Sequence, residues 1–304
     1  MTRKRATFAK IVAALLSLAF AGIVSLTIPA LAQNANPVTT DGIPDKAHPA
    51  HIVQIEAPSH GATLFGVFYA AAGAGAHPTV LLLHGFPGYE QNMDLAQAIR
   101  RAGWNVFTFH YRGAWGSHGD FSFTHATEDG AAMLAYLRNP ANATRLSVDP
   151  ARIVVIGHSM GGFMAAYTAA HDAKLAGLIT ISAMNIGAEA ARTSPQQEQA
   201  VIARYRQNSG PLTGCTAESL WAEARRNGTQ WDYVKFAPRI AAFPVLVVES
   251  DDRTLQDVRA FAAALRQSGN LRVSELHLPT DHVYSDQRIA LATAIIQWLD
   301  QLPH

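Results

Sequence analysis

The chain has 304 residues, of which 49% are hydrophobic and 15% charged, a composition that excludes the disordered and fibrous classes. The formal net charge is +1 with histidine neutral, so charge gives no reason to expect nucleic acid or an acidic membrane surface as a partner. The single cysteine, Cys215, excludes an intramolecular disulfide.

Residues 1–32 have the pattern of a secretory signal peptide. Four basic residues precede an apolar stretch over 11–28, and the motif Ala30-Leu-Ala32 follows it. This order is typical of a signal that is cleaved after the Ala-x-Ala motif. We therefore expect an exported protein, periplasmic or secreted, with no stable membrane insertion after cleavage. The alternative is an uncleaved anchor, because 11–28 reaches only the lower length limit of a membrane-spanning helix.

Residues 33–50, rich in Asn, Pro, Thr, Asp and Gly, are predicted to form an extended linker. One domain is predicted over 51–304. Its first segments, 51–57 and 63–69, alternate in polarity or are rich in β-branched and aromatic residues. They predict two antiparallel strands joined by a turn at Ser59-His60-Gly61.

Short apolar runs and helix-forming stretches alternate from residue 78 onward. Strands are predicted at 79–84, 105–110, 152–156, 178–182, 244–249 and 271–278, and helices at 92–102, 126–138, 161–171, 255–267 and 285–302. This alternation predicts an α/β fold with a doubly wound, mostly parallel sheet. The segment 185–243 interrupts the alternation and is polar and helix-prone in parts, which predicts an inserted helical cap.

The segment Gly157-His158-Ser159-Met160-Gly161 matches the pattern Gly-x-Ser-x-Gly. An apolar strand precedes it and a helix-forming stretch follows, which is the setting of a nucleophile elbow. The flanking glycines remove the Cβ atoms that would clash at such a sharp turn. The pattern predicts Ser159 as a nucleophile beside a helix N-terminus, whose amides can stabilise an oxyanion.

A second candidate segment, His84-Gly85-Phe86-Pro87-Gly88, directly follows the first buried strand. A His-Gly turn in this position supplies a second amide to the oxyanion site in proteins with a nucleophile elbow. We therefore predict an oxyanion hole formed by the backbone N–H groups of Phe86 and Met160.

These two segments, together with Tyr111-Arg-Gly-Ala-Trp-Gly-Ser-His-Gly, resemble the α/β-hydrolase superfamily, and most closely its esterase and serine-peptidase-like branches with a small cap. The resemblance covers about residues 79–304. It implies an α/β-hydrolase fold and a catalytic triad whose members follow the chain order serine, acid, histidine.

The acid of that triad is expected just after the strand that follows the cap, where the chain offers Asp251 and Asp252. The family usually has a glycine near the end of this strand, and Ser250 stands in its place, which makes Asp252 the favoured acid and leaves Asp251 open. Asp257 is a third candidate, on a predicted helix where it would face solvent. The chemistry requires a carboxylate that orients the histidine and stabilises its imidazolium form.

The histidine is expected in the loop after the last strand, and His282 in Leu278-Pro-Thr-Asp-His-Val-Tyr satisfies this. The other histidines near the end of the chain do not, because His277 lies within the predicted strand and His304 is the last residue. His158, beside the nucleophile, is expected to be structural.

The resemblance implies a serine hydrolase that cleaves carboxylic esters or amides through an acyl-enzyme, with a small-molecule ester or a peptide as substrate. A peptidase remains the main alternative, and an exopeptidase would need a carboxylate near the pocket. The insert offers three: Glu198, Glu218 and Glu223. Its aromatic residues are equally compatible with an acyl pocket and with packing: Trp221, Trp231 and Tyr233.

Other classes of function have weaker support. No His-Glu-x-x-His motif, Cys/His cluster or phosphate-binding glycine loop occurs in the sequence, so no metal or cofactor is expected. A non-catalytic, exported binding protein on the same fold is a more distant alternative, since fold does not guarantee activity.

Overall fold

The computed structural model describes residues 36–240 and 242–303. The predicted signal peptide, 1–32, lies outside the described residues, so it remains a prediction. Residues 36–50 contain no helix or strand. Among the described residues, no helix is long and apolar enough to cross a membrane.

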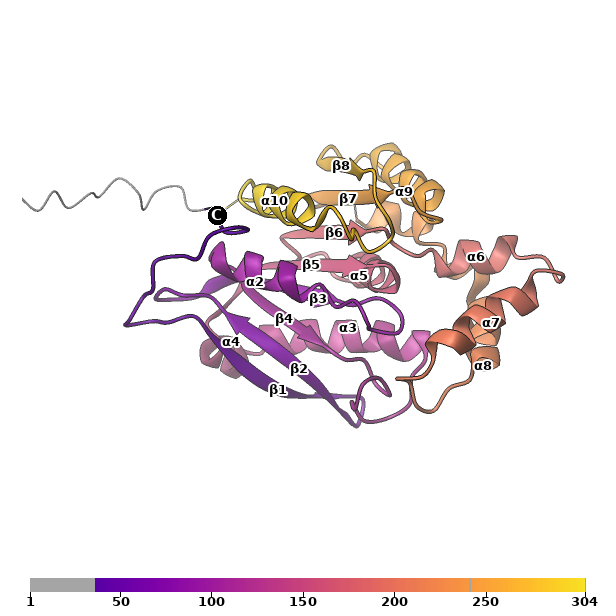
Figure 1. Ribbon diagram of the computed structural model, residues 1–304, viewed down its shortest axis with the longest axis horizontal. Helices are drawn as coiled ribbons and strands as arrows, with labels where there is room; N and C mark the ends of the chain where they lie inside the picture. Colours follow the sequence, from indigo (N-terminus) through magenta and orange to yellow (C-terminus); the bar gives the residue numbers. More distant parts are fainter. Residues whose placement is uncertain (1–35, 241, 304) are drawn as a thin grey trace, which may run out of the picture. The chain divides into compact units, whose positions relative to one another are not determined.

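A single eight-stranded sheet runs through the described domain in the order β1-β2-β4-β3-β5-β6-β7-β8 (Figure 1). The strands are β1 (His51–Ser59), β2 (Ala62–Ala70), β3 (His77–Leu83), β4 (Asn105–Phe109), β5 (Val148–His158), β6 (Gly177–Ile181), β7 (Val245–Ser250) and β8 (Val273–Leu278). β1 and β2 are antiparallel, and β2 also pairs antiparallel with β4. All other pairs are parallel, which confirms the predicted mostly parallel sheet.

Helices cover both faces of this sheet because its central strands are apolar on both sides. In β3, Val80 and Leu82 face one core, and Leu81 and Leu83 face the other. Outside the insert, the helices are α2 (Met93–Arg101), α3 (Phe123–Arg138), α4 (Pro140–Arg145), α5 (Met160–His171), α9 (Leu255–Gln267) and α10 (Arg288–Leu299). α2 and α10 contribute to the first core, and α3, α5 and α9 contribute to the second (Figure 1).

The segment between β6 and β7 is helical, as predicted. It contains α6 (Ile186–Arg192), α7 (Glu198–Asn208), α8 (Ala217–Asn227), and the short 3-10 helices η2 (Gly228–Trp231) and η3 (Tyr233–Arg239). α8 packs on both α6 and α7 beyond one end of the sheet (Figure 1). η3 differs from the prediction of one cap over 185–243, because it packs on α5 and α9 beside the sheet. Phe236 contacts Phe163 there, and Tyr233 contacts Phe261.

Parallel strands bring their carboxyl ends to one edge of a sheet, where open α/β folds bind their ligands. Here β5 leads into Ser159, β7 into Asp252, and β8 into the loop that carries His282. The insert leaves the sheet at the same edge, directly after β6. The fold thus gathers the predicted triad at a single edge, next to the helical insert.

Candidate active site

Ser159 is the single residue between β5 and α5, and its backbone is strained, with φ 57° and ψ −121°. A positive φ is unfavourable for a residue with a side chain, so surrounding contacts must hold it. The Ser159 amide donates to the carbonyl of Ile181 in β6 at 2.9 Å. Its carbonyl accepts from Gly162 at 2.9 Å and from Met184 at 2.9 Å. The neighbouring strand and the following helix therefore hold the sharp turn that the sequence predicted.

The glycines around Ser159 permit this turn because other backbone lies where their side chains would be. A Cβ atom on Gly157 would lie 1.9 Å from the carbonyl oxygen of Gly161. A Cβ atom on Gly161 would lie 2.1 Å from the carbonyl oxygen of Leu83 at the end of β3. Neither the first turn of α5 nor the end of β3 can move away cheaply, so both positions require glycine.

Replacing Gly161 by alanine is therefore expected to lower the free energy of unfolding by about 3 kcal/mol or more, because the new methyl group overlaps the β3 backbone. Urea unfolding followed by circular dichroism measures this. Gly42→Ala is a matched control, since a Cβ atom there meets nothing within 4 Å, and it is expected to change stability by less than about 0.5 kcal/mol. Equal unfolding midpoints for the two variants would contradict the steric argument.

The structure brings Ser159, His282 and Asp252 into one hydrogen-bonded chain. Nε2 of His282 lies 2.9 Å from Oγ of Ser159, and Nδ1 lies 2.6 Å from Oδ2 of Asp252. An ionised carboxylate can only accept, so Nδ1 carries the ring proton and Nε2 accepts from the serine hydroxyl. This is the arrangement in which a histidine can remove the proton of a nucleophilic serine.

Asp252 is held as an ionised acceptor by donors on both carboxylate oxygens. Oδ1 accepts from the amide and the hydroxyl of Thr254, each at 2.6 Å. Oδ2 accepts from Oγ of Ser250 at 2.9 Å, besides the bond from His282. Burial alone would raise the pKa of Asp252, but the hydrogen bonds from His282 and Thr254 outweigh it and hold that pKa well below its usual value. The carboxylate is therefore charged at neutral pH.

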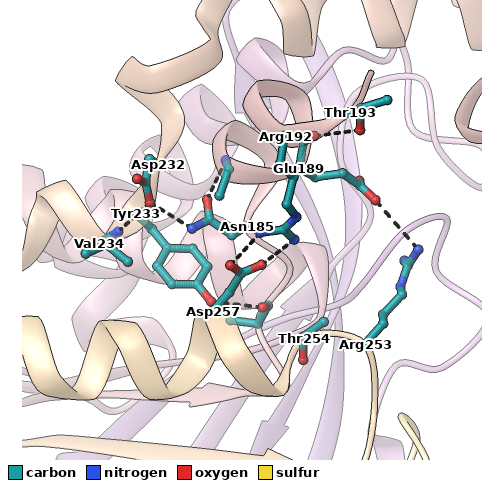
Figure 2. Close-up of polar contacts among 12 residues, drawn as sticks. Asn185, Glu189, Arg192, Thr193, Asp232, Tyr233, Val234, Arg253, Thr254 and Asp257 are labelled. Atoms are coloured by element: carbon teal, nitrogen blue, oxygen red, sulfur yellow. Dashed lines mark hydrogen bonds and ion pairs between the residues drawn. The ribbon is translucent and has the colours of Figure 1, made fainter. Parts of the chain in front are cut away.

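The other two candidate acids do not reach His282. The Asp251 side chain is exposed and lies 3.2 Å from Nε2 of His277 instead. Asp257 forms two bonds with Arg192 of α6, at 2.7 and 2.6 Å, which Figure 2 shows. The prediction that Asp257 faces solvent is wrong, because its carboxylate pairs with Arg192 of the insert and Asp257 is only 8% exposed. Of the candidate acids, Asp252 has the geometry that the triad requires.

His158 supports the His282 loop. Its ring is buried, and Nε2 lies 2.8 Å from the carbonyl oxygen of His282. Burial, together with the neighbouring His282, lowers the pKa of His158 to about 3. The ring is therefore neutral at neutral pH and donates from Nε2 to that carbonyl. This contact agrees with the structural role that we expected for His158.

The loop 84–88 lies against the nucleophile. A Cβ atom on Gly85 would lie only 3.0 Å from Cβ of Ser159, so the backbone leading into Phe86 passes beside the serine. Met160 is the first residue of α5, where an amide has no partner within the helix. In the described part of the chain, no acceptor takes the amide proton of Phe86 or of Met160. Both amides are free for an oxyanion, and their role as its donors remains a prediction.

The side chain and the carbonyl of His84 form hydrogen bonds that hold this loop in place. Its Nδ1 lies 2.8 Å from the carbonyl oxygen of Gly85, and its own carbonyl accepts from the hydroxyl of Tyr111 at 3.2 Å. Burial lowers the pKa of His84 to about 4, so the ring is neutral and Nδ1 donates. The buried histidine thus fixes the peptide that precedes Phe86.

Helix α7 of the insert supplies an aromatic side chain next to this loop. The ring of Tyr205 lies 5.6 Å from that of Phe86 and 5.9 Å from that of Phe123. The sequence around Tyr205 contains no motif that would reveal this position, because a single aromatic residue on a polar helix forms no local pattern. The three aromatic residues considered for an acyl pocket are instead packed in the interior: Trp221, Trp231 and Tyr233.

Two of the three carboxylates considered for an exopeptidase are already engaged by other residues of the chain. Both oxygens of Glu223 accept bonds from the first turn of α3, from the amides of Phe123 and Thr124. Glu218 is exposed and pairs with Arg206 on α7. Glu198 is half-buried at the first turn of α7. Within residues 36–240 and 242–303, no group of three or more His, Cys, Asp or Glu side chains could hold a metal ion.

The chain belongs to the α/β-hydrolase fold family, whose model matches residues 78–256. Solved structures agree in fold. The carboxylesterase EstE1 from a metagenomic library is 22% identical at a TM-score of 0.60, with 84% of this chain and 91% of that chain covered. An esterase from Pyrobaculum calidifontis is 18% identical at a TM-score of 0.59, with 83% and 86% covered.

An acylaminoacyl peptidase from Pyrococcus horikoshii has the same fold over part of its length. It is 15% identical at a TM-score of 0.61, with 83% of this chain and 42% of that chain covered. No curated protein sequence matches the chain. At these identities the structural comparisons establish the α/β-hydrolase fold, and the choice between ester and peptide substrates depends on the site.

Proposed function

We propose that this chain is a serine hydrolase that cleaves carboxylic esters through an acyl-enzyme. The observation that carries the proposal is the hydrogen-bonded chain from Oγ of Ser159 through His282 to Oδ2 of Asp252, at 2.9 and 2.6 Å. The strained serine and the two free amides beside it support the same chemistry.

In the proposed mechanism, Oγ of Ser159 attacks the ester carbonyl carbon while Nε2 of His282 takes its proton. The amides of Phe86 and Met160 stabilise the oxyanion, at about 3 kcal/mol per donor. The imidazolium, stabilised by Asp252, then protonates the departing alcohol. Water activated by His282 attacks the acyl-enzyme, and the acid and free serine are released.

An ester substrate fits the surroundings better than a free amino terminus does. Glu189 of α6 is a carboxylate of the insert that faces the acid loop, and Figure 2 shows it paired with Arg253, which follows Asp252. It bonds Arg204 at 2.6 Å and lies 3.8 Å from Arg253. Its charge is thus already balanced by cations. One of its oxygens, Oε2, is buried without a partner and is the feature that favours the peptidase alternative.

We expect p-nitrophenyl esters of short acids to be hydrolysed at least as fast as aminoacyl p-nitroanilides. We expect Glu189→Gln to lower kcat/KM for both substrate types by the same factor, because the carboxylate does not bind an ammonium group in this proposal. Parallel kinetic assays of both panels check this. Cleavage of anilides alone, together with a selective loss of that activity in Glu189→Gln, would instead establish a peptidase.

Labelling with a fluorophosphonate tests the nucleophile before a substrate is known. Stoichiometric labelling at Ser159 is expected, whereas an exported, non-catalytic binding protein would remain unlabelled. We also propose that the protein acts outside the cytoplasm, on the basis of the signal-peptide pattern in residues 1–32. Mass spectrometry of exported protein should find an N-terminus at Gln33, and retention of residues 1–32 would point to an anchor.

A further inference from the structure

Three buried hydroxyl groups form a hydrogen-bonded chain that ends on the triad acid. Oγ of Ser250, at the end of β7, lies 2.9 Å from Oδ2 of Asp252. Oγ of Ser182, just after β6, lies 2.9 Å from Oγ of Ser250 and 2.9 Å from the hydroxyl of Tyr284. The exposed fractions of Ser182, Ser250 and Tyr284 are 0%, 1% and 0%, so water does not compete for these bonds.

The direction of every bond in this chain follows from counting protons. The Asp252 carboxylate can only accept hydrogen bonds, so the single hydroxyl proton of Ser250 is donated to it. Ser182 must then donate to Ser250, and its remaining acceptor site is open to Tyr284. The phenol therefore donates to Ser182. Burial, opposed by these hydrogen bonds, raises the pKa of Tyr284 to about 12, so the phenol keeps its proton at neutral pH.

The chain joins the three segments whose relative positions set the triad. Ser182 follows the strand next to the nucleophile, Ser250 belongs to the strand of the acid, and Tyr284 lies two residues beyond His282. Ser182 and Tyr284 also have positive φ values, 41° and 61°, which the packed surroundings must hold. Backbone strain of this kind is usual at sites where the protein must hold a side chain in one orientation.

We infer that Ser250, Ser182 and Tyr284 form a positioning relay that orients Asp252 and moderates its basicity toward His282. This inference rests on the proposed function, because it concerns the acid of that same triad. Each hydroxyl polarises the next one. The last hydrogen bond, from Ser250 to Oδ2 of Asp252, is therefore strengthened by the two hydrogen bonds that precede it. Oδ2 is the oxygen that also accepts from His282, so the relay acts on the bond that matters for proton transfer.

Removal of the Ser250 hydroxyl leaves the carboxylate with more charge to stabilise the imidazolium. In Ser250→Ala we therefore expect the acid limb of kcat/KM against pH to move to higher pH by about half a unit or more. We expect kcat/KM on the pH plateau to fall about tenfold, because Asp252 loses one of the hydrogen bonds that orient it toward His282. Tyr284→Phe, which removes only the far end of the relay, should move the limb in the same direction by less.

A matched control removes a comparable bond elsewhere. Ser59 is 2% exposed and donates to Asp129 at 2.6 Å, far from the triad in sequence. Ser59→Ala is expected to lower Tm while leaving the acid limb in place. If Ser250→Ala or Tyr284→Phe lowers Tm and leaves the limb at or below its wild-type pH, the relay is merely structural and the inference is overturned. Fluorophosphonate labelling of the wild type separates this outcome from failure of the proposed function.

Discussion

Ser159→Ala is expected to reduce kcat for an ester substrate by at least about 10⁴-fold, equivalent to about 5.5 kcal/mol of transition-state stabilisation. The reason is that the acyl-enzyme cannot form without Oγ, while the amides of Phe86 and Met160 and the rest of the site remain. Residual activity should reflect those groups alone. Steady-state kinetics, with product analysis at high enzyme concentration, measures the loss.

The fold should survive this substitution, because the turn at Ser159 is held by backbone bonds to Ile181, Gly162 and Met184 rather than by the hydroxyl. Alanine at a positive φ is itself strained, so Tm has to be measured alongside. Ser274→Ala, an exposed serine on β8, serves as the control and should keep full activity. Retention of more than about a hundredth of the activity in folded Ser159→Ala would show that another group is the nucleophile.

The positions that the sequence predicted best are those with a local pattern. The elbow combines a motif, an apolar strand and a helix within a few residues, so it placed Ser159 without knowledge of the fold. His282 and Asp252 needed one further fact, the chain order of a triad, because the sheet topology alone brings residues that far apart together. The chain order of a triad does not distinguish Asp251 from Asp252, because the two residues are adjacent. What distinguishes them is the direction of their side chains, which the folded turn determines.

The elements that the sequence missed are short and held by caps or by tertiary packing. Helix α4 begins at Pro140 after Asn139, whose side chain accepts from two amides, and this Asn-Pro signal could have been used. Helix α6 has only seven residues and is capped by Asn185. η3 was assigned to the cap because a turn of 3-10 helix gives no pattern that reveals which layer it packs on.

The relay behind Asp252 could not be predicted from the sequence at all. Ser182, Ser250 and Tyr284 come from three separate segments. They meet because β6 and β7 are neighbours in the sheet and because the His282 loop brings Tyr284 to Ser182. Serine is common at strand ends for reasons unrelated to function. The burial of these hydroxyls and their hydrogen-bond partners, which link them in a chain ending at one carboxylate, are properties of the folded state.

Asp252→Asn is expected to lower kcat/KM by about 10⁴-fold with little change in fold. The new amide retains the shape of the side chain, but an N–H group facing Nδ1 of His282 would force that nitrogen to become an acceptor. Nε2 would then carry the proton and could not remove one from Ser159. The pH dependence of kcat/KM, together with the rate of fluorophosphonate labelling, reports whether the nucleophile is still activated.

Asp251→Asn is the matched control for this prediction, because the two residues are adjacent and Asp251 contacts His277 rather than His282. It removes the same charge from the same turn, so its effect on activity measures the general electrostatic contribution of that charge. We expect a change of less than about threefold, as for an exposed carboxylate screened by solvent. A comparable loss in both variants would mean that net charge near the site, and not the orientation of His282, controls the rate, and the triad assignment of Asp252 would fail.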